Sequence, residues 1–383
     1  MRIAFISTIL GYPWGSPDRL WTELADRCLQ REDAVFLGIS SLTADHDDVR
    51  ALQSNGAEIF IRTENSVYRG SRDTITRTLP WNRRSYLEYQ LSAFAPDVVL
   101  ITQGATYDSL AEHHLRNWIQ RHRVPYVVIC HNNASGAALT QIDAQTVRAF
   151  LGAASKTLFV STQNRQLAEQ QLARTLTRTD LVQNPLSALT NSALPFPIQS
   201  DTPVFGIVGR IDIHHKGLDL LFEAIAGLES PIRLILTGRV EEPDELQSLL
   251  LAYGLKDQIE IRGAVKSSQV TQAYAEMELF ILSSRYEGCA SSMIEALMCG
   301  RPVLATNVGG VSDWISNGVE GFVATEVSAP AIQSTLARAL KVRSHWASMG
   351  TAARARFDLQ RVQDPVDLLL REVDAVVGQI IPT

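Results

Sequence analysis

The fold is decided by residues 283–310, which read Ser283-Ser-Arg-Tyr-Glu-Gly-Cys-Ala-Ser-Ser-Met-Ile-Glu-Ala-Leu-Met-Cys-Gly-Arg-Pro-Val-Leu-Ala-Thr-Asn-Val-Gly-Gly310. An apolar strand that ends near Leu282 is expected to lead into a loop rich in Gly and Ser, and a helix is expected from Ser291 to Cys299. Gly300 ends this helix, and Val303–Thr306 has the composition of a further buried strand. The order strand, loop, helix, strand predicts a parallel α/β sheet.

The loop and the start of the helix have the composition of a phosphate-binding site. A helix N-terminus presents unpaired N–H donors and a partial positive charge, and small residues let the backbone approach a ligand. Glu287 and Glu295 would repel a phosphate, so they are expected to accept hydrogen bonds from hydroxyls of a sugar ring and a ribose. Either acid alone is compatible with an ordinary loop or helix-surface residue. The small residues between them, which favour a site, are Gly288, Ala290, Ser291 and Ser292.

A second charged cluster follows the predicted strand Val204–Val208. Arg210 and Lys216 flank a turn that opens a helix, so two cations and a helix N-terminus are expected at one place. A diphosphate leaving group needs this charge, because the transition state places negative charge on its bridging oxygen. The alternative is that both cations are solvated surface charges. The adjacent His214 and His215 point apart, and no carboxylate pattern completes a metal site with them.

Short apolar runs alternate with amphipathic segments along the whole chain. Several runs are continuous, which is typical of parallel strands buried on both faces. Helical patterns lie between them, for example over Arg19–Arg31 and Gly217–Gly227. The predicted strands are Arg2–Ser7, Ala34–Gly38, Glu58–Ile61, Val98–Thr102, Tyr126–Cys130, Thr157–Ser161, Val204–Val208, Arg233–Thr237, Ile259–Arg262, Leu279–Leu282, Val303–Thr306 and Gly321–Val323. Two such sets predict the α/β class, with two Rossmann-like doubly wound domains.

The domain boundary is expected in a linker. The 383 residues exceed what one hydrophobic core usually serves, so two domains are expected. The segment Asn184–Pro203 carries four prolines and no helical pattern. The expected domains are residues 1–190 and 200–358. Ligands of α/β domains lie outside the carboxyl ends of the strands, so the cleft between two facing domains is expected to hold the substrates.

The composition, with 45% apolar and 20% charged residues, is that of a folded globular protein. No apolar run approaches the ~20 residues that span a bilayer. Met1–Leu10 has one positive charge and a short apolar stretch, but Gly11–Gly15 is a poor cleavage site, so a buried strand and a cytoplasmic location are expected. The four cysteines are widely scattered, which argues against a disulfide framework and against a zinc site. They are Cys28, Cys130, Cys289 and Cys299.

The net charge of −6 is unevenly distributed. Residues 1–199 carry 19 Lys and Arg against 18 Asp and Glu, and the remainder is acidic. This imbalance is too weak to indicate nucleic-acid binding. The segment Arg62–Arg84 is rich in Arg, with Tyr68 and Trp81 interleaved. It is expected to be either a solvated loop or a contact for an anionic acceptor or an anionic lipid surface.

Four sequence elements carry a family resemblance. They are Glu-x7-Glu at Glu287 and Glu295, Gly-Arg…Lys-Gly at Gly209, Arg210, Lys216 and Gly217, Gly-x-Pro-Val…Gly-Gly at Gly300, Pro302, Val303, Gly309 and Gly310, and the glycine loop Gly15-Ser-Pro-Asp-Arg19. Through these elements the chain resembles, over most of its length, a retaining nucleotide-sugar glycosyltransferase of the GT-B fold, similar to glycosyltransferase family four (glycosyl transferases group 1). The usual second glycine of the N-terminal loop is Ser16 here, and Arg210 and Lys216 are six positions apart where five is more common.

The resemblance implies a role for each site residue. Arg210 and Lys216 would neutralise the donor diphosphate, Glu295 would bind the ribose, and Glu287 would bind hydroxyls of the transferred sugar. His131 would lie near the sugar and the reacting centre. Asp18, Asn132 and Asn133 are candidates for contacts with the acceptor. The backbone that would reach the donor belongs to Gly15, Ser16, Gly209, Gly288, Cys289, Ala290, Ser291 and Ser292.

The chemistry implied by the resemblance is transfer of a hexosyl-type sugar with retention of anomeric configuration. The donor would be a nucleoside-diphosphate sugar, with UDP favoured over GDP, and the acceptor a hydroxyl of a glycan, a lipid-linked molecule or a small molecule, as in polysaccharide biosynthesis. The departing phosphate oxygen is close enough to take the acceptor proton. No general base, cofactor or metal is then expected. Asp45-His-Asp47 matches a metal-binding D-x-D element, but its place at the apparent start of a helix favours a capping role.

Two alternatives remain open. One is a sugar-nucleotide epimerase or a phosphorylase on the same fold, and the other is a non-catalytic subunit that binds a sugar nucleotide. A dehydrogenase is disfavoured because no predicted strand is followed by G-x-G-x-x-G. A last helix is predicted from Pro365 to Ile381, within residues 360–383. The resemblance places it on the first domain, and packing on its own domain is the alternative.

Overall fold

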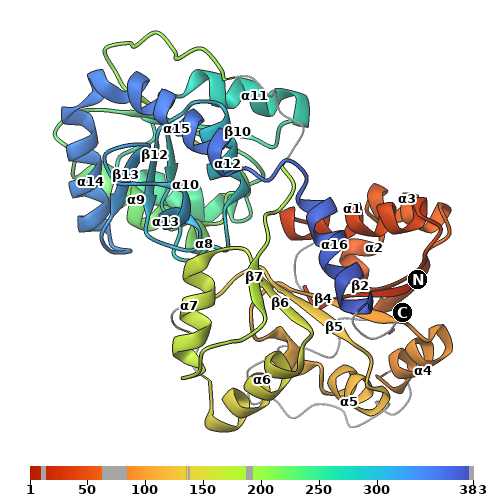
Figure 1. Ribbon diagram of the computed structural model, residues 1–383. Helices are drawn as coiled ribbons and strands as arrows, with labels where there is room; N and C mark the ends of the chain where they lie inside the picture. The colour runs from red at the N-terminus through yellow and green to blue at the C-terminus, as the bar shows by residue number, and fades with distance from the viewer. Residues whose placement is uncertain (10–13, 63–83, 135, 137–138, 187–192, 379–383) are drawn as a thin grey trace. The chain divides into compact units, whose positions relative to one another are not determined.

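The computed structural model describes the chain except for residues 10–13, 63–83, 135, 137–138, 187–192 and 379–383 (Figure 1). The chain divides into two compact units. Unit 1 comprises Met1–Pro185 and Gln363–Thr383, and unit 2 comprises Leu186–Val362. The boundary between Pro185 and Leu186 lies inside the Pro-rich segment Asn184–Pro203.

Unit 1 is built on a seven-stranded parallel sheet with the order β3-β2-β1-β4-β5-β6-β7. All six residues of β4 are buried, as expected for a strand covered on both faces. Because β1 pairs with both β2 and β4, the strand order reverses at β1, and ligands of such sheets bind beside this reversal. The strands are β1 (Arg2–Ser7), β2 (Ala34–Ser40), β3 (Glu58–Arg62), β4 (Val98–Gln103), β5 (Tyr126–Cys130), β6 (Lys156–Phe159) and β7 (Thr179–Leu181).

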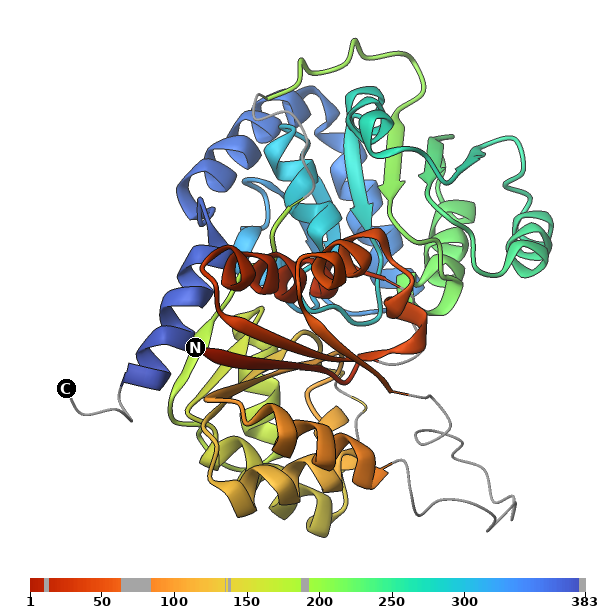
Figure 2. The ribbon, with the colours of Figure 1, turned by 90° about the vertical axis from the view of Figure 1, so that its right-hand side faces the viewer.

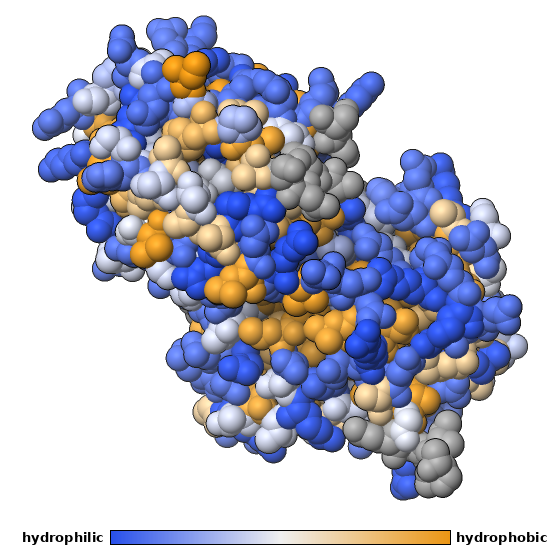
Figure 3. All heavy atoms as spheres, turned by 45° about the horizontal axis from the view of Figure 1, so that its top comes forward, coloured by the Kyte–Doolittle hydropathy of each residue, from blue (hydrophilic) through white to orange (hydrophobic). Residues whose placement is uncertain are grey.

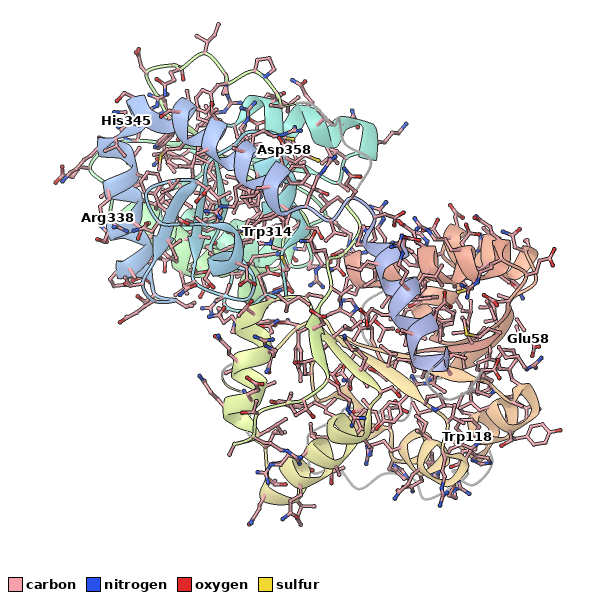
Figure 4. All side chains as sticks on the ribbon, in the orientation of Figure 1. Glu58, Trp118, Trp314, Arg338, His345 and Asp358 are labelled. Carbon is pink, nitrogen blue, oxygen red and sulfur yellow. The ribbon has the colours of Figure 1, made fainter. Side chains whose placement is uncertain are left out.

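Helices cover both faces of this sheet, with α1 on one face and α4 and α5 on the other (Figure 2). Trp118 of α5 is part of the core beneath the sheet (Figure 4). The helical segments are α1 (Ser16–Gln30), α2 (Ser41–Ala44), α3 (Asp47–Ser54), α4 (Arg84–Phe94), η1 (Asp108–Ala111), α5 (His113–His122), α6 (Gln141–Ala153), α7 (Thr162–Gln171) and α16 (Pro365–Gly378).

The final helix α16 belongs to unit 1, where it packs against α1. Its buried side chains are Val366, Leu369, Val373 and Val376. Two ion pairs connect α1 to this end of the chain, Arg27 with Asp364 and Arg31 with Asp374, each at 2.7 Å. The sheet of unit 1 is therefore covered by residues from both ends of the chain.

Unit 2 is built on a six-stranded parallel sheet with the order β10-β9-β8-β11-β12-β13. Its strand order reverses at β8, which pairs with β9 on one side and β11 on the other. The strands are β8 (Val204–Val208), β9 (Arg233–Thr237), β10 (Ile259–Gly263), β11 (Leu279–Leu282), β12 (Val303–Thr306) and β13 (Gly321–Ala324). The carboxyl ends of β8 and β11 are thus neighbours, although Val208 and Leu282 are 74 positions apart in the chain.

The core of unit 2 lies on both faces of its sheet. Trp314 of α13 is buried in one of the two clusters (Figure 4). The face seen in Figure 3 is mainly hydrophilic in both units, with smaller apolar areas. The helical segments are α8 (Ile213–Lys216), α9 (Leu218–Ala226), α10 (Pro243–Ala252), α11 (Ser267–Glu276), α12 (Ser291–Met298), α13 (Val311–Trp314), α14 (Ala329–Lys341), η2 (Arg343–His345) and α15 (Trp346–Gln360).

The predicted fold class is confirmed, because both units have parallel Rossmann-like sheets covered by helices. Strand β7 was not predicted; it has three residues and a mainly exposed side-chain pattern, so it carries no apolar signal. Helix α1 begins at Ser16, three residues before the expected start, because Asp18 accepts a hydrogen bond from the N–H of Gly15 and thereby caps the start of the helix. Within the described ranges, no helix is both long and apolar enough to span a bilayer.

Candidate active site

The candidate site of unit 2 lies where β8 and β11 end side by side. Gly209 and Arg210 directly follow β8, and Glu287 lies on the loop after β11. Lys216 is the last residue of the short helix α8. The strand order reverses between these two strands, and that position is where open α/β sheets bind ligands.

Glu287 is held by a lysine and a serine. Lys216 donates from Nζ to Oε1 of Glu287 at 2.6 Å, and Ser284 donates from Oγ to the same oxygen at 2.7 Å. Only 8% of Glu287 is exposed. Burial alone would raise the pKa of this carboxyl, but the charge of Lys216 and the hydrogen bonds from Lys216 and Ser284 outweigh burial and hold the pKa below its usual value. Glu287 is therefore a buried carboxylate that stays ionised at neutral pH.

A close backbone contact brings Lys216 to Glu287. Gly217 has φ +60°, and a Cβ at this position would lie 2.3 Å from the carbonyl oxygen of Ser283. Ser283 in turn donates from Oγ to the carbonyl oxygen of Lys216 at 2.7 Å. Only glycine adopts this conformation and allows this approach without strain. The Lys-Gly pair of the sequence motif thus places the turn after α8 directly on the end of β11.

Arg210 contacts a histidine whose role the sequence did not reveal. Its Nη2 atom lies 3.2 Å from Nδ1 of His215, and Nε2 of His215 lies 3.0 Å from the carbonyl oxygen of Tyr286. The rings of His215 and Tyr286 stack at a centroid distance of 4.6 Å. Burial is the main reason that the pKa of His215 is lowered. Tyr286 is distant in sequence, so no local spacing could have predicted this contact.

The loop after Glu287 is fixed by the glycine pair that follows β12. Gly309 has φ +55°, and a Cβ there would lie 2.3 Å from the carbonyl oxygen of Gly288. The N–H of Gly310 donates to this same oxygen at 2.8 Å. A Cβ on Gly310 would lie 2.7 Å from Sγ of Cys289. These contacts hold the backbone of Gly288 and Cys289 against the turn that follows β12.

Helix α12 begins at the end of this loop. Its N-cap residue, Ala290, makes no side-chain cap, so the first N–H groups of the helix receive no side-chain oxygen from it. Ser291 and Ser292 form the first turn. Burial raises the pKa of the Cys289 thiol to about 12, so this cysteine is a neutral apolar neighbour of the loop. The start of α12 is therefore a candidate position for an anion.

Glu295 lies inside α12 and is 6% exposed. The hydroxyl of Tyr274, from α11, lies 2.9 Å from Oε2 of Glu295 and 3.0 Å from the carbonyl oxygen of Ser292. Burial, and then the neighbouring Glu295, raise the pKa of Tyr274 well above its ordinary value, so the phenol remains a hydrogen-bond donor. Tyr274 orients Glu295, and this role could not be predicted from the motif because Tyr274 precedes Glu295 by 21 positions.

In unit 1, His131 directly follows β5 and is 5% exposed. Its Nε2 atom lies 2.9 Å from Oγ1 of Thr102, the penultimate residue of β4. Within the described part of the chain, its Nδ1 atom has no hydrogen-bond partner. Burial lowers the pKa of His131 to about 3, so its imidazole is neutral at physiological pH.

The two asparagines after His131 make hydrogen bonds to other residues of unit 1. The carbonyl oxygen of Asn132 accepts hydrogen bonds from N and Oγ1 of Thr106, both at 2.9 Å. Asn133 donates from Nδ2 to Oε1 of Gln171 at 3.0 Å. Gln171 donates to the carbonyl oxygen of Ala134 at 2.9 Å. The loop after β5 is therefore tied to neighbouring loops and to α7.

Asp18, in the N-terminal glycine loop, makes hydrogen bonds within unit 1. Gly15 is the N-cap of α1, Ser16 is its first residue, and Asp18 accepts hydrogen bonds from the N–H of Gly15 at 2.9 Å and the indole of Trp21 at 3.1 Å. Asp18 is 1% exposed, and burial raises its pKa to about 6. These contacts show Asp18 as a capping residue of α1.

The D-x-D element lies at a helix start. The ring of His46 caps α3 by accepting from the N–H of Asp48 at 3.3 Å, and Asp45 pairs with Arg50 at 3.3 Å. In the described residues, no group of three or more His, Cys, Asp and Glu side chains is placed to hold a metal ion.

The Arg-rich segment is described only at its ends. Arg62 pairs with Glu112 and donates to the carbonyl oxygen of Ser7, so the first arginine of the segment is used inside unit 1. Residues 63–83, with Arg69, Arg72, Arg77 and Arg83, lie outside the described residues.

Comparison with known families finds a match in unit 2. Residues 194–356 match the family model described as "Glycosyl transferases group 1". A glycogen synthase of Pseudomonas fluorescens Pf0-1 is 33% identical over 145 residues, which are 37% of this chain and 29% of that protein. A glycogen synthase of Pseudomonas fluorescens Pf-5 is 33% identical over 187 residues, 47% of this chain and 35% of that protein. The matched region thus spans about a third of the length of these curated relatives.

Solved structures resemble the chain over nearly its whole length. The Anabaena protein HepE in complex with UDP and glucose has a TM-score of 0.70 at 18% identity, with 98% of this chain and 99% of that chain covered. Sucrose-phosphate synthase from Thermosynechococcus elongatus has a TM-score of 0.70 at 15% identity, with both chains fully covered. At these identities the likeness shows the fold. The expected resemblance to a GT-B glycosyltransferase of group 1 is confirmed by the matched unit and by this fold.

Proposed function

We propose that this protein is a glycosyltransferase that moves a hexosyl-type sugar from a nucleoside-diphosphate sugar to an acceptor hydroxyl with retention of anomeric configuration. The observation that carries the proposal is the pair of Lys216 with the buried, ionised Glu287, set beside Arg210 where β8 and β11 end. A cation for phosphate and a carboxylate for hydroxyls are thus held together at the ligand-binding edge of a sheet. The match of residues 194–356 to glycosyl transferases group 1 supports the same activity.

Each charged residue of unit 2 has a proposed task. Arg210 and Lys216 neutralise the diphosphate, whose bridging oxygen gains negative charge as the sugar leaves. Glu287, an ionised carboxylate held by Lys216 and Ser284, accepts hydrogen bonds from hydroxyls of the transferred sugar. Glu295, oriented by Tyr274, accepts from the ribose hydroxyls.

Backbone groups complete the proposed donor site. The first N–H groups of α12, at Ser291 and Ser292, face an anion with the partial positive charge of the helix end. Gly288, Cys289 and Ala290 bring the loop backbone to the sugar. Gly209 contributes the turn after β8. The proposal also assigns donor contacts to Gly15 and Ser16 of unit 1, at the start of α1.

His131 is the proposed catalytic residue of unit 1. Its neutral imidazole has an unpaired Nδ1 atom among the described residues, and such an atom is suited to a hydrogen bond with a sugar hydroxyl. Asn132 and Asn133 remain proposed acceptor contacts, although Asn133 also holds Gln171. The proposed acceptor role of Asp18 is weakened by its capping contacts with Gly15 and Trp21.

The proposed reaction needs no protein base. The bond between the anomeric carbon and the diphosphate oxygen breaks, and the acceptor oxygen bonds to the same face of that carbon. The acceptor proton passes to the departing phosphate oxygen, which lies on that face, so charge and atoms balance without a further reactant. The positive charge of Arg210 and Lys216 takes the place that a divalent metal has in other enzymes, and activity without added metal is proposed.

Similar proteins support a choice of donor nucleotide and acceptor class. The HepE structures contain UDP, UDP with glucose, and UDP-glucose, which favours UDP over GDP as the donor nucleotide here. The matched relatives are glycogen synthases, so a glycan is the favoured acceptor class and polysaccharide biosynthesis the favoured process. A lipid-linked or small-molecule acceptor, a cytoplasmic location and contact of Arg62–Arg84 with an anionic acceptor or membrane surface are parts of the same proposal.

A donor screen tests the proposal. Release of nucleoside diphosphate is measured for UDP- and GDP-sugars with oligosaccharide acceptors, and turnover that depends on the acceptor is expected. Conversion of the donor without an acceptor would indicate an epimerase, and consumption of inorganic phosphate would indicate a phosphorylase. Nucleotide binding by calorimetry without turnover would indicate a non-catalytic subunit. Absence of both binding and turnover would refute the proposed site.

A further inference from the structure

The side chain of His215 lies in the candidate active site but takes no part in the proposed transfer. Its Nδ1 atom is 3.2 Å from Nη2 of Arg210, and its Nε2 atom is 3.0 Å from the carbonyl oxygen of Tyr286. Its main chain is fixed as well, because its N–H donates to Oδ1 of Asp212 at 2.7 Å and its carbonyl oxygen accepts from the N–H of Arg285 at 2.9 Å. The ring therefore has a defined place between Arg210 and the loop after β11.

These contacts determine where the imidazole carries its proton. A guanidinium nitrogen can only donate, so Nδ1 of His215 accepts the hydrogen bond from Arg210. A carbonyl oxygen can only accept, so Nε2 carries the proton and donates to Tyr286. The ring is neutral in this arrangement. Protonation would place an N–H at Nδ1 against the N–H of Arg210 and remove that hydrogen bond.

The charged groups around His215 act in opposite directions. Burial lowers its pKa, and Lys216 and Arg210 lower it as well, whereas Glu287 and Asp212 raise it; the net effect is a pKa below the ordinary value of 6.5. Oε1 of Glu287 lies 3.7 Å from Nε2. These groups come from α8, from the segment after β8 and from the loop after β11. The neutral ring is therefore the form present at neutral pH.

We infer that His215 is a positioning residue that helps to hold the guanidinium of Arg210 for the donor diphosphate, and that protonation of the imidazole removes this hydrogen bond. The inference rests on the proposed function, because it assigns His215 a task only if Arg210 binds a diphosphate. A donor pocket that loses the orientation of one cation binds the diphosphate more weakly. The affinity for the donor thus falls as the medium becomes acidic.

Three substitutions separate the contacts of the ring. In His215→Asn, the amide oxygen takes about the place of Nδ1, accepts from Arg210 and does not titrate. In His215→Gln, the amide nitrogen takes about the place of Nε2 and keeps the hydrogen bond to Tyr286. His215→Phe keeps only the stacking on the Tyr286 ring. His214→Asn is the matched control, because His214 is the exposed neighbour in the same helix.

The measurement is KM for the nucleotide sugar and kcat between pH 5 and 9. Near pH 7.5, His215→Phe and His215→Gln are expected to raise KM about tenfold with little change in kcat, as for the loss of a hydrogen bond to a charged group. His215→Asn is expected to keep the wild-type KM there and to lose most of the acid rise in KM seen in the wild type. The His214→Asn profile is expected to match the wild type.

Two results would overturn the inference. One is a wild-type KM in His215→Phe, and the other is an unchanged acid rise in His215→Asn. A nitrogen NMR spectrum of the imidazole in the full chain provides a test that is independent of turnover, with a neutral ring protonated on Nε2 expected at pH 7. If that form is found but no donor is turned over or bound, the proposed function fails and the assigned geometry stands. A ring protonated on Nδ1 refutes the inference in either case.

Discussion

The ammonium group of Lys216 lies 2.6 Å from Oε1 of Glu287, although the two residues are 71 positions apart in the chain. The contact is a buried ion pair, since both side chains are only 13% and 10% exposed. Breaking a buried pair by removing one partner leaves an uncompensated charge, whereas removing both does not. The pair therefore couples the stability of unit 2 to the electrostatics of the proposed donor site.

Substitution of Lys216 or Glu287 is expected to reduce both the stability of the protein and its turnover of the donor. Lys216→Met should lower the free energy of unfolding by about 3 kcal/mol, because Glu287 stays buried without its cation. It should also lower kcat/KM for the donor by about 100-fold or more. Thermal unfolding and nucleoside diphosphate release measure the two effects. Lys256→Met, at an exposed lysine, is the control.

The double variant Lys216→Met with Glu287→Gln tests whether loss of the ion pair causes the loss of stability. Its stability loss should be smaller than the sum of the two single losses, because the pair interacts. Additive losses would show that the ion pair does not contribute as described. Full activity in Lys216→Met or Glu287→Ala would refute the candidate site.

Removal of the Tyr274 hydroxyl is expected to weaken donor binding. In Tyr274→Phe, Oε2 of Glu295 and the carbonyl oxygen of Ser292 lose their shared donor, which costs about 1 to 2 kcal/mol of stability. KM for the donor should rise about tenfold while kcat changes little, since the ribose contact is made equally in the ground and transition states. Tyr253→Phe, at the end of α10, is the control. An equal stability loss with unchanged KM would show that Tyr274 only packs.

The turn after α8 gives a prediction about backbone geometry. Gly217→Ala introduces a Cβ at 2.3 Å from the carbonyl oxygen of Ser283, in addition to the cost of φ +60°. Gly254→Ala has a similar φ of +66° and no atom within 4 Å of the new Cβ. The Gly254 variant should lose about 1 kcal/mol, the conformational cost alone. Calorimetry should show a larger loss for Gly217→Ala, together with loss of donor turnover, and equal losses would contradict the described contact.

His131 gives a prediction about pH. Its pKa falls from 6.5 to about 3 on folding, so the folded state binds fewer protons than the unfolded state between these values. Stability from this group is complete above pH 6.5 and is lost as the pH falls, by about 1.4 kcal/mol per unit. Asp18, with its pKa raised to about 6, contributes the opposite slope between its ordinary value and pH 6. The comparison of wild type with His131→Asn by urea unfolding at pH 7 and pH 5 cancels the Asp18 contribution.

Between pH 7 and pH 5, the wild type is expected to lose about 2 kcal/mol of stability that His131→Asn does not lose. Identical pH slopes in both proteins would show that the imidazole titrates normally in the fold.

Chelation tests the proposed independence from metal. Turnover should be the same within a factor of about two after dialysis against EDTA, because Arg210 and Lys216 supply the positive charge at the diphosphate. Asp45→Asn with Asp47→Asn should likewise leave kcat unchanged, since Asp45 follows α2 and Asp47 is the first residue of α3. Complete loss of turnover in EDTA that Mg²⁺ restores would overturn this part of the proposal.

The fold could be predicted because buried parallel strands carry a continuous apolar signal. The strand Leu279–Leu282 and the helix beginning at Ser291 were expected where the structure has them. Strand β7 escaped prediction because its short, mainly exposed sequence lacks this signal. The start of α1 was placed too late because the capping contacts of Asp18 were not foreseen.

The candidate site could be predicted only in its motif residues. Glycines with positive φ, such as Gly217 and Gly309, leave a mark in the sequence because few other residues fit their place. His215 and Tyr274 leave no such mark, since their contacts with Arg210 and Glu295 depend on how α8 and α11 pack in the folded unit. Local spacing predicts what a loop can bind, and tertiary packing decides which side chains orient it.

The return of α16 to unit 1 determines the order in which the chain can be assembled. Unit 1 needs residues from Met1–Pro185 and from Gln363 onward, so a ribosome must deliver all of unit 2 before unit 1 can be completed. Unit 2 is contiguous and can fold while α1 still lacks the cover of Val366, Leu369 and Val373. During synthesis, the sheet of unit 1 therefore remains incompletely covered until α16 has been made, with an apolar face accessible to chaperones and proteases.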